Sequence, residues 1–252
     1  MWNDLSFYQI LIAIGGGFLA GVINTLAGNG SAITLPILMF VLGLPPNVAN
    51  GTNRIGVLTQ GIIGSTTFYK HKMFHPKAHP IVIIPVFLGA MIGMWLAIHV
   101  SPTAFKQVFG YLLIIMLFVV LAHPRRWLHP TKKPVSPWVQ VLIMIGLGVY
   151  GGFIQMGMGI FFLATTVLLS GIHIIRANAL KVFVVTTYTL VLLIVFHMKG
   201  MVDWRIGSLL AIGQGAGGWI TARWASKYPH ADVWAYRLLL LTMVWAVVRI
   251  FL

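Results

Sequence analysis

Two polar stretches within apolar sequence have residue types that could bind a small anion. The first, residues 28–31, alternates glycine with Asn29 and Ser31, whose side chains can donate hydrogen bonds to an oxyanion. The second opens an expected helix near residue 47 with the donors Asn50, Thr52, Asn53 and Arg54. A helix N-terminus carries free N–H groups and a partial positive charge, and a guanidinium can hold an oxyanion through two parallel hydrogen bonds. We therefore predict an anion-binding site built from both stretches.

The second half of the chain contains a similar helix start. A helix expected from about Ile175 places Asn178 and Lys181 in its first turns, and a shift of 128 residues superimposes Ala49–Asn50 on Ala177–Asn178. We predict that Asn178 and Lys181 face the first set of donors across the substrate. The alternative for the cations is that they extend to lipid headgroups at the membrane surface.

Catalytic and metal-binding chemistry have little support in the sequence. Cysteine and glutamate are absent, and the three acidic residues lie in expected loops or at segment ends. His71, His75 and His79 recur every fourth residue, but Pro76 and Pro80 disfavour the helix that would align them as metal ligands. We expect no enzyme activity, no metal and no cofactor.

Composition places the chain in a membrane. Of its 252 residues, 59% are hydrophobic and only 8% are charged, and the mean hydropathy is +0.93. A soluble domain carries about 25% charged residues, so we expect an integral membrane protein in the lipid bilayer. Recurrent apolar runs long enough for helices predict an all-α fold. The net charge of +14 comes from Lys and Arg concentrated in short loops, which is typical of topology signals rather than of nucleic-acid binding.

The expected helices follow the order long, short, long, long, long, and then repeat it. We predict segments at 7–27, 31–43, 47–68, 81–100 and 104–122, and again at 137–156, 159–170, 175–197, 206–225 and 232–251. We therefore divide the chain into a first transmembrane repeat at 1–122, a basic cytoplasmic linker at 123–136 and a second transmembrane repeat at 137–252. Each repeat comprises a broken, re-entrant hairpin and three transmembrane helices.

The distribution of Lys and Arg predicts the orientation of the helices. Placing the basic loops 69–80 and 123–136 in the cytoplasm puts both termini outside and leaves more cations inside than outside. Each repeat then contributes an odd number of segments, so the two repeats are inverted. Many secondary transporters are built this way, with the substrate site at the repeat interface near the membrane midplane.

Close helix packing is expected at two pairs of glycines spaced four residues apart, Gly89/Gly93 and Gly213/Gly217. Small residues at this spacing let the backbones of membrane helices approach one another. We interpret both pairs as structural and assign them no part in substrate binding.

The polar stretches and their surroundings resemble the sulfite exporter TauE/SafE family. The similarity rests on the glycine-broken first hairpin and on three motifs, Leu35–Leu38 with its proline, the Gly43–Pro46 turn and Ala49–Asn53. It is specific over residues 15–54 and extends along the chain as the two-repeat pattern with a basic loop between the halves. Met156 and Met158 depart from it, since small residues are usual in the tip of the second hairpin, residues 155–159.

The resemblance implies transport of small anions such as sulfite, sulfonates and related sulfur-containing or organic anions across the bacterial inner membrane. We accordingly predict a multi-pass secondary transporter that acts as an exporter by alternating access. An anion channel is one alternative. A membrane-embedded enzyme or assembly factor, with the histidines of 71–79 as its metal ligands, is another. A homodimer is one assembly left open.

Overall fold

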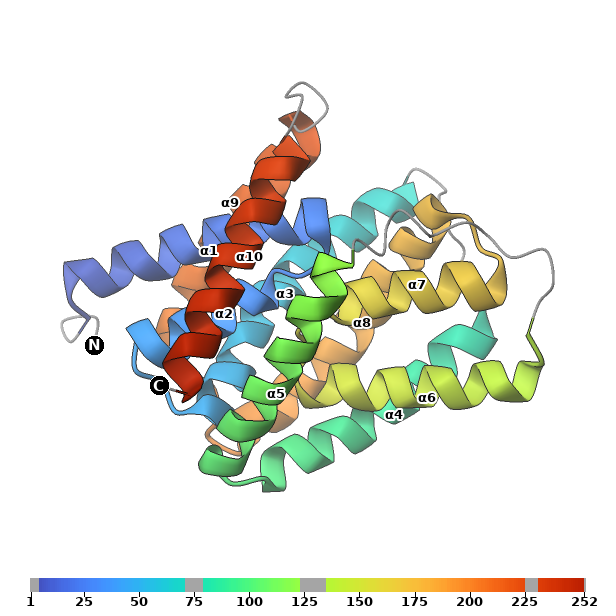
Figure 1. Ribbon diagram of the computed structural model, residues 1–252, viewed down its shortest axis with the longest axis horizontal. Coiled ribbons are helices and arrows are strands. Elements are labelled where there is room, and N and C mark those ends of the chain that lie inside the picture. Colours follow the sequence, from blue (N-terminus) through green and yellow to red (C-terminus); the bar gives the residue numbers. More distant parts are fainter. Residues whose placement is uncertain (1–4, 71–78, 123–134, 225–230, 252) are drawn as a thin grey trace.

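The protein is all-helical over the residues that its computed structural model describes, which are 5–70, 79–122, 135–224 and 231–251. The elements are α1 Phe7–Ala27, α2 Ser31–Pro36, the π-helix η1 Ile37–Val41, α3 Pro46–Lys70, α4 Pro80–His99, α5 Pro102–Leu121, α6 Pro137–Phe153, α7 Met158–Ser170, α8 Ile174–Met198, α9 Trp204–Trp224 and α10 Ala231–Phe251 (Figure 1). The predicted all-α fold is confirmed, and every predicted segment coincides with one or two of these elements. The expected linker at 123–136 lies outside the described residues except for its last two positions.

Local sequence signals set several helix ends. Ser6 and Gln9 form a capping box, in which the Ser6 hydroxyl accepts from the Gln9 N–H and the Gln9 side-chain oxygen accepts from the Ser6 N–H. Pro80, Pro102 and Pro137 open α4, α5 and α6. A proline fits there because the first N–H groups of a helix have no partner within it. These signals explain why the boundaries were predictable.

The short predicted segment 31–43 is a helix whose hydrogen-bond pattern changes at a proline. Pro36 has no N–H to donate and ends α2, and the chain continues as η1. There the Leu42 N–H donates to the Ile37 carbonyl five residues back, at 2.9 Å. The proline therefore shifts the helical pattern without breaking the segment.

Glycines allow two helix pairs to pack with their backbones in contact. A Cβ added to Gly217 of α9 would lie 2.1 Å from the Phe18 carbonyl oxygen of α1, and one added to Gly93 of α4 would lie 2.0 Å from the Val149 carbonyl oxygen of α6. Gly213 and Gly89 are equally close to those partner helices. The close packing predicted at both glycine pairs is confirmed, and Figure 1 shows α4 and α6 lying side by side.

The main helix contacts are reciprocal between the two halves of the chain. α1 packs on α9 as α6 packs on α4, and α3 contacts α9 as α8 contacts α4. The central helices α3 and α8 contact each other, and so do α5 and α10. The first helix of each half therefore packs against the fourth helix of the other half.

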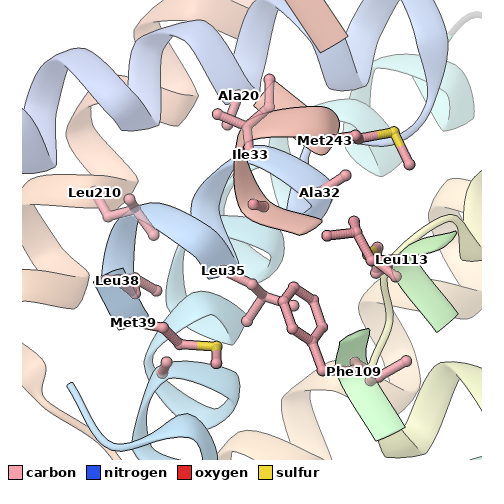
Figure 2. Close-up of a cluster of buried hydrophobic side chains, with 14 of the residues drawn as sticks. Ala20, Ala32, Ile33, Leu35, Leu38, Met39, Phe109, Leu113, Leu210 and Met243 are labelled. Atoms are coloured by element: carbon pink, nitrogen blue, oxygen red, sulfur yellow. The ribbon is translucent and has the colours of Figure 1, made fainter. Parts of the chain in front are cut away.

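The broken segment of the first half lies at the centre of a large apolar cluster. All six residues of α2 are buried. Figure 2 shows Leu35 of α2 beside Phe109 of α5, and Leu38 of η1 on the side of Leu210 of α9. In a bilayer such contacts are stabilised by close van der Waals packing, since lipid tails are as apolar as the side chains. This packing fixes the position of the polar residues that precede α2.

The outward-facing surface is suited to lipid. Leu88 of α4 is 54% exposed, Phe118 of α5 is 66% exposed and Leu142 of α6 is 68% exposed. By length and composition, four described helical segments can cross a membrane: Phe7–Thr25, Pro80–His99, Pro102–Leu121 and Ile175–Met198. The apolar segments 31–41, 137–153 and 158–170 are shorter. The fold is that of a multi-pass membrane protein.

Candidate functional site

The two glycine-containing tips, residues 28–31 and residues 155–159, meet inside the molecule. Asn29 of the first tip accepts a hydrogen bond at its Oδ1 from the Gly157 N–H of the second tip, at 2.7 Å. A Cβ added to Gly159 would lie 2.5 Å from the Gly28 carbonyl oxygen, so only glycine permits this approach. Gly28 itself ends α1 with φ 75°, a conformation that glycine adopts without strain. The tips therefore form one structural unit from segments distant in sequence.

A cavity of about 710 Å³ lies against the joined tips. Residues of α1, α3, α8 and α9 form its walls, and both tips contribute to its lining. Its polar lining residues are Asn24, Thr25, Asn29, Ser31, Gln60, Gln155, Asn178, Lys181 and Arg223. Its size is in the range of pockets that hold small molecules.

The cavity carries positive charge and, among its described lining residues, no carboxylate. Lys181 is half-buried, and its Nζ lies 3.9 Å from the point where a Cβ on Gly28 would stand, so the ammonium is beside the first tip. Arg223 lies near the end of α9 and is exposed. Cations in a cleft with low-dielectric walls raise the local concentration of anions. The electrostatics of this cavity favour an anionic ligand.

Four of the residues predicted as substrate ligands line the cavity: Asn29, Ser31, Asn178 and Lys181. The other four, Asn50, Thr52, Asn53 and Arg54, are buried behind the tips. Asn50 Nδ2 donates to the Phe153 carbonyl at 2.9 Å, and Thr52 Oγ1 accepts from the Asp203 N–H at 2.9 Å. Asn50 therefore holds the end of α6, and Thr52 holds the segment that precedes α9.

Asn53 and Arg54 connect α3 directly to the two tips. Asn53 Nδ2 donates to Ser31 Oγ at 3.1 Å in the first tip. Arg54 Nη2 donates to the Gly152 carbonyl at 2.6 Å, and Nη1 reaches Gln155 Oε1 at 3.5 Å in the second tip. The guanidinium also lies 4.9 Å from the centre of the Phe196 ring, which offers a further favourable contact for a buried cation. In this structure Arg54 positions the second tip.

Gln60, which the sequence analysis did not single out, is the centre of a polar cluster in the cavity wall. Its Oε1 accepts from Asn24 Nδ2 at 2.8 Å and from Gln214 Nε2 at 3.1 Å. Its Nε2 donates to Thr25 Oγ1 at 3.2 Å. An amide within an apolar helix is costly unless it is paired. Gln60 and Gln214 were therefore detectable in the sequence as glutamines inside membrane-length apolar segments.

Gln155 is the second residue that sequence reasoning undervalued. It lines the cavity and has φ 60°, a left-handed conformation that is unusual for a residue with a side chain. Its Nε2 donates to Thr189 Oγ1 at 3.1 Å while its oxygen faces Arg54. The second tip is thus polar despite its methionines. Gln155 places an amide there, and the oxygen and the nitrogen of that amide are both held in fixed directions.

The described residues hold no group of three or more His, Cys, Asp or Glu side chains that could bind a metal ion. His71 and His75 lie outside the described residues. His79 precedes α4, where burial lowers its pKa and the nearby positive charge of Arg176 lowers it further. The His79 ring is therefore expected to be neutral at pH 7.

Comparison with known proteins points to membrane transport. The family model described as Sulfite exporter TauE/SafE matches residues 13–250. The chain is 29% identical to a probable membrane transporter protein of Sinorhizobium sp, over 88% of this chain and 85% of that protein. It is 26% identical to one from Haemophilus influenzae, over 83% and 82%, and 27% identical to YfcA of Escherichia coli, also described as a probable membrane transporter protein, over 78% and 73%. No solved structure gives a significant match.

Proposed function

The chain belongs to the sulfite exporter TauE/SafE family of membrane transporters, and from this premise we propose that it carries small anions through the cavity beside its joined tips. Sulfite, sulfonates and related sulfur-containing or organic anions are the substrates we expect, with export as the direction. One observation carries the proposal: a cavity of about 710 Å³, lined by Lys181 and Arg223, ends at two tips in backbone contact. Anion binding fits that charge, and transport fits the family.

We propose that the structure faces the cytoplasm. The cavity is lined by residues near the ends of α3, α8 and α9, at Phe68, Asn178 and Arg223. The positive-inside rule places the loops at these ends in the cytoplasm. On the opposite side the joined tips separate the cavity from the segment 199–203, which covers the start of α3. There a Cβ on Gly51 would lie 2.0 Å from the Met201 carbonyl oxygen.

Alternating access would then require the two halves to move against each other and part the tips. The reciprocal helix contacts support two inverted repeats, 1–122 and 137–252, related across α3 and α8. The linker between the two repeats, residues 123–136, would stay in the cytoplasm. A channel needs a continuous polar path, whereas the contact between Gly28 and Gly159 interrupts the path in this conformation. We therefore favour a carrier over a channel, and a transporter over an enzyme.

Uptake into liposomes tests the proposal. The purified protein would be reconstituted and offered radiolabelled sulfite, sulfate, an alkyl sulfonate and a small organic acid, each with and without a pH gradient. We expect saturable uptake of at least one sulfur oxyanion above protein-free liposomes. Uptake that rises linearly with concentration would favour a channel, and no uptake of any anion under either condition would reject the proposed function.

A further inference from the structure

The orientation of the Asn29 side chain is fixed by the backbone N–H of Gly157, which can only donate a hydrogen bond. Its Oδ1 accepts from the Gly157 backbone N–H, so the amide nitrogen must face the other way. That nitrogen, Nδ2, is buried and has no hydrogen-bond partner within the described part of the chain. A buried N–H without an acceptor is unfavourable, and an oxyanion at the tip would supply the acceptor.

Ser31 and Gln155 also line the cavity, and the side-chain oxygen of each likewise accepts a hydrogen bond from a protein donor. Ser31 Oγ accepts from Asn53 Nδ2, which leaves the hydroxyl hydrogen to be donated. Gln155 Oε1 faces the guanidinium of Arg54, which has no acceptor of its own, so the Gln155 nitrogen must point elsewhere. That nitrogen donates to Thr189 and also lies beside the Tyr188 hydroxyl, so Gln155 presents donors on this side.

We propose that Asn29, Ser31 and Gln155 form a donor set that favours anions without an acidic proton, because a protein donor already contacts each of their oxygen atoms and turns their N–H and O–H groups toward the ligand. The inference rests on the proposed function and specifies the chemistry of its site. An anion that still carries a proton must donate it to an acceptor, and each oxygen of the donor set already accepts a hydrogen bond from the protein. Specificity of this kind arises because the rejected ligand leaves a polar group unpaired. Asn53 and Arg54 are positioning residues that act through Ser31 and Gln155.

Two anions of matched shape separate this inference from simple charge attraction. Methanesulfonate and methylphosphonate are both tetrahedral, and at a mildly acidic pH each carries one negative charge, but only methylphosphonate keeps an acidic proton. Competition against uptake of the best substrate from the liposome panel would give the apparent affinity of each. We expect the wild-type protein to prefer methanesulfonate by about tenfold or more, the scale of one hydrogen bond to a charged group. Equal affinities would overturn the donor set.

Asn29→Asp supplies a direct second test. Aspartate keeps the oxygen that accepts from Gly157 and replaces the free N–H group by an acceptor. We expect the preference for methanesulfonate over methylphosphonate to fall by about tenfold or more. Asn47→Asp is the matched control, since Asn47 also accepts a backbone N–H, from Val48, but does not line the cavity.

The outcomes distinguish the two proposals. An unchanged preference in a folded Asn29→Asp protein would reject the donor set while leaving anion transport intact. If the variant does not fold, the wild-type comparison decides alone. Absence of transport for every anion in the wild-type protein would instead reject the proposed function.

Discussion

Asn29 and Gly157 are joined by a hydrogen bond of 2.7 Å although they lie 128 residues apart in the chain. This bond connects the end of α1 to the start of α7 and so ties the two halves together beside the cavity. A carrier that opens to the other side of the membrane must part or shift this contact. Its residues are therefore expected to affect both stability and transport.

Removing the acceptor at Asn29 should destabilise the protein. Asn29→Ala leaves the buried Gly157 N–H without a partner, at a cost of about 1–3 kcal/mol. Asn29→Asp keeps the accepting oxygen and should lose less. Thermal unfolding in detergent, followed by tryptophan fluorescence, measures both variants. Equal melting temperatures for Asn29→Ala and the wild type would show that the bond contributes nothing to folding.

Replacing Arg54 by lysine should impair transport even though the charge is kept. Lysine is a point donor and cannot serve the Gly152 carbonyl and Gln155 together as the guanidinium fork does. We expect uptake to fall by about tenfold or more, with a stability loss of about 1–3 kcal/mol. Arg249→Lys, at an exposed position on α10, is the control. Full uptake by Arg54→Lys would show that transport does not need the hydrogen bonds of the Arg54 guanidinium.

The contact between α1 and α9 should not tolerate a single added methyl group. In Gly217→Ala the new Cβ would lie 2.1 Å from the Phe18 carbonyl oxygen, so the helices must separate. Overpacking of this kind costs about 1–3 kcal/mol. Gly146→Ala on α6 is matched to it, because a Cβ there meets nothing within 4 Å. We expect Gly146→Ala to be neutral or stabilising by about 0.5–1 kcal/mol. Similar melting temperatures for both variants would contradict the packing.

Because the chain contains no cysteine, single introduced thiols can report on the orientation of the cavity. Asn178→Cys, in the cavity wall, should react with a membrane-impermeant reagent applied to the cytoplasmic face, and a transported anion should slow the reaction. Lys199→Cys, at the opposite end of α8, should react only from the outside. Reaction of both thiols from the same face would refute the assigned topology.

Much of the fold could be predicted because helix length, proline position and glycine spacing are local properties. The proline starts of α4, α5 and α6 and the glycine pairs of α4 and α9 are examples. The π-helix η1 could not be predicted in the same manner, since it depends on how the chain after Pro36 fits among α5, α9 and α10.

Four of the eight predicted ligands line the cavity, and the four that do not all lie on α3. Asn50, Asn53 and Arg54 share a helical stripe with Val57 and Gln60, since residues three and four apart lie on one face. The tips cover the first part of that stripe and the cavity adjoins the second. Polarity in the sequence pointed to this stripe, and its part in substrate binding stays a prediction. Which turn of it the second tip and the end of α6 would cover depends on contacts between residues 98 and 103 positions apart, and these leave no local signal.

The central claim is that the transported anion binds beside the tips, and a pair of lysine variants tests it most directly. Lys181→Gln removes the cation near Gly28, whereas Lys199→Gln makes the same change at the other end of α8, outside the cavity lining. Uptake of the best substrate into liposomes would be compared at equal amounts of folded protein. We predict that Lys181→Gln loses about tenfold or more of the uptake efficiency, as expected for a lost interaction with a charged ligand, and that Lys199→Gln keeps the wild-type value. Undiminished uptake by Lys181→Gln would contradict the account.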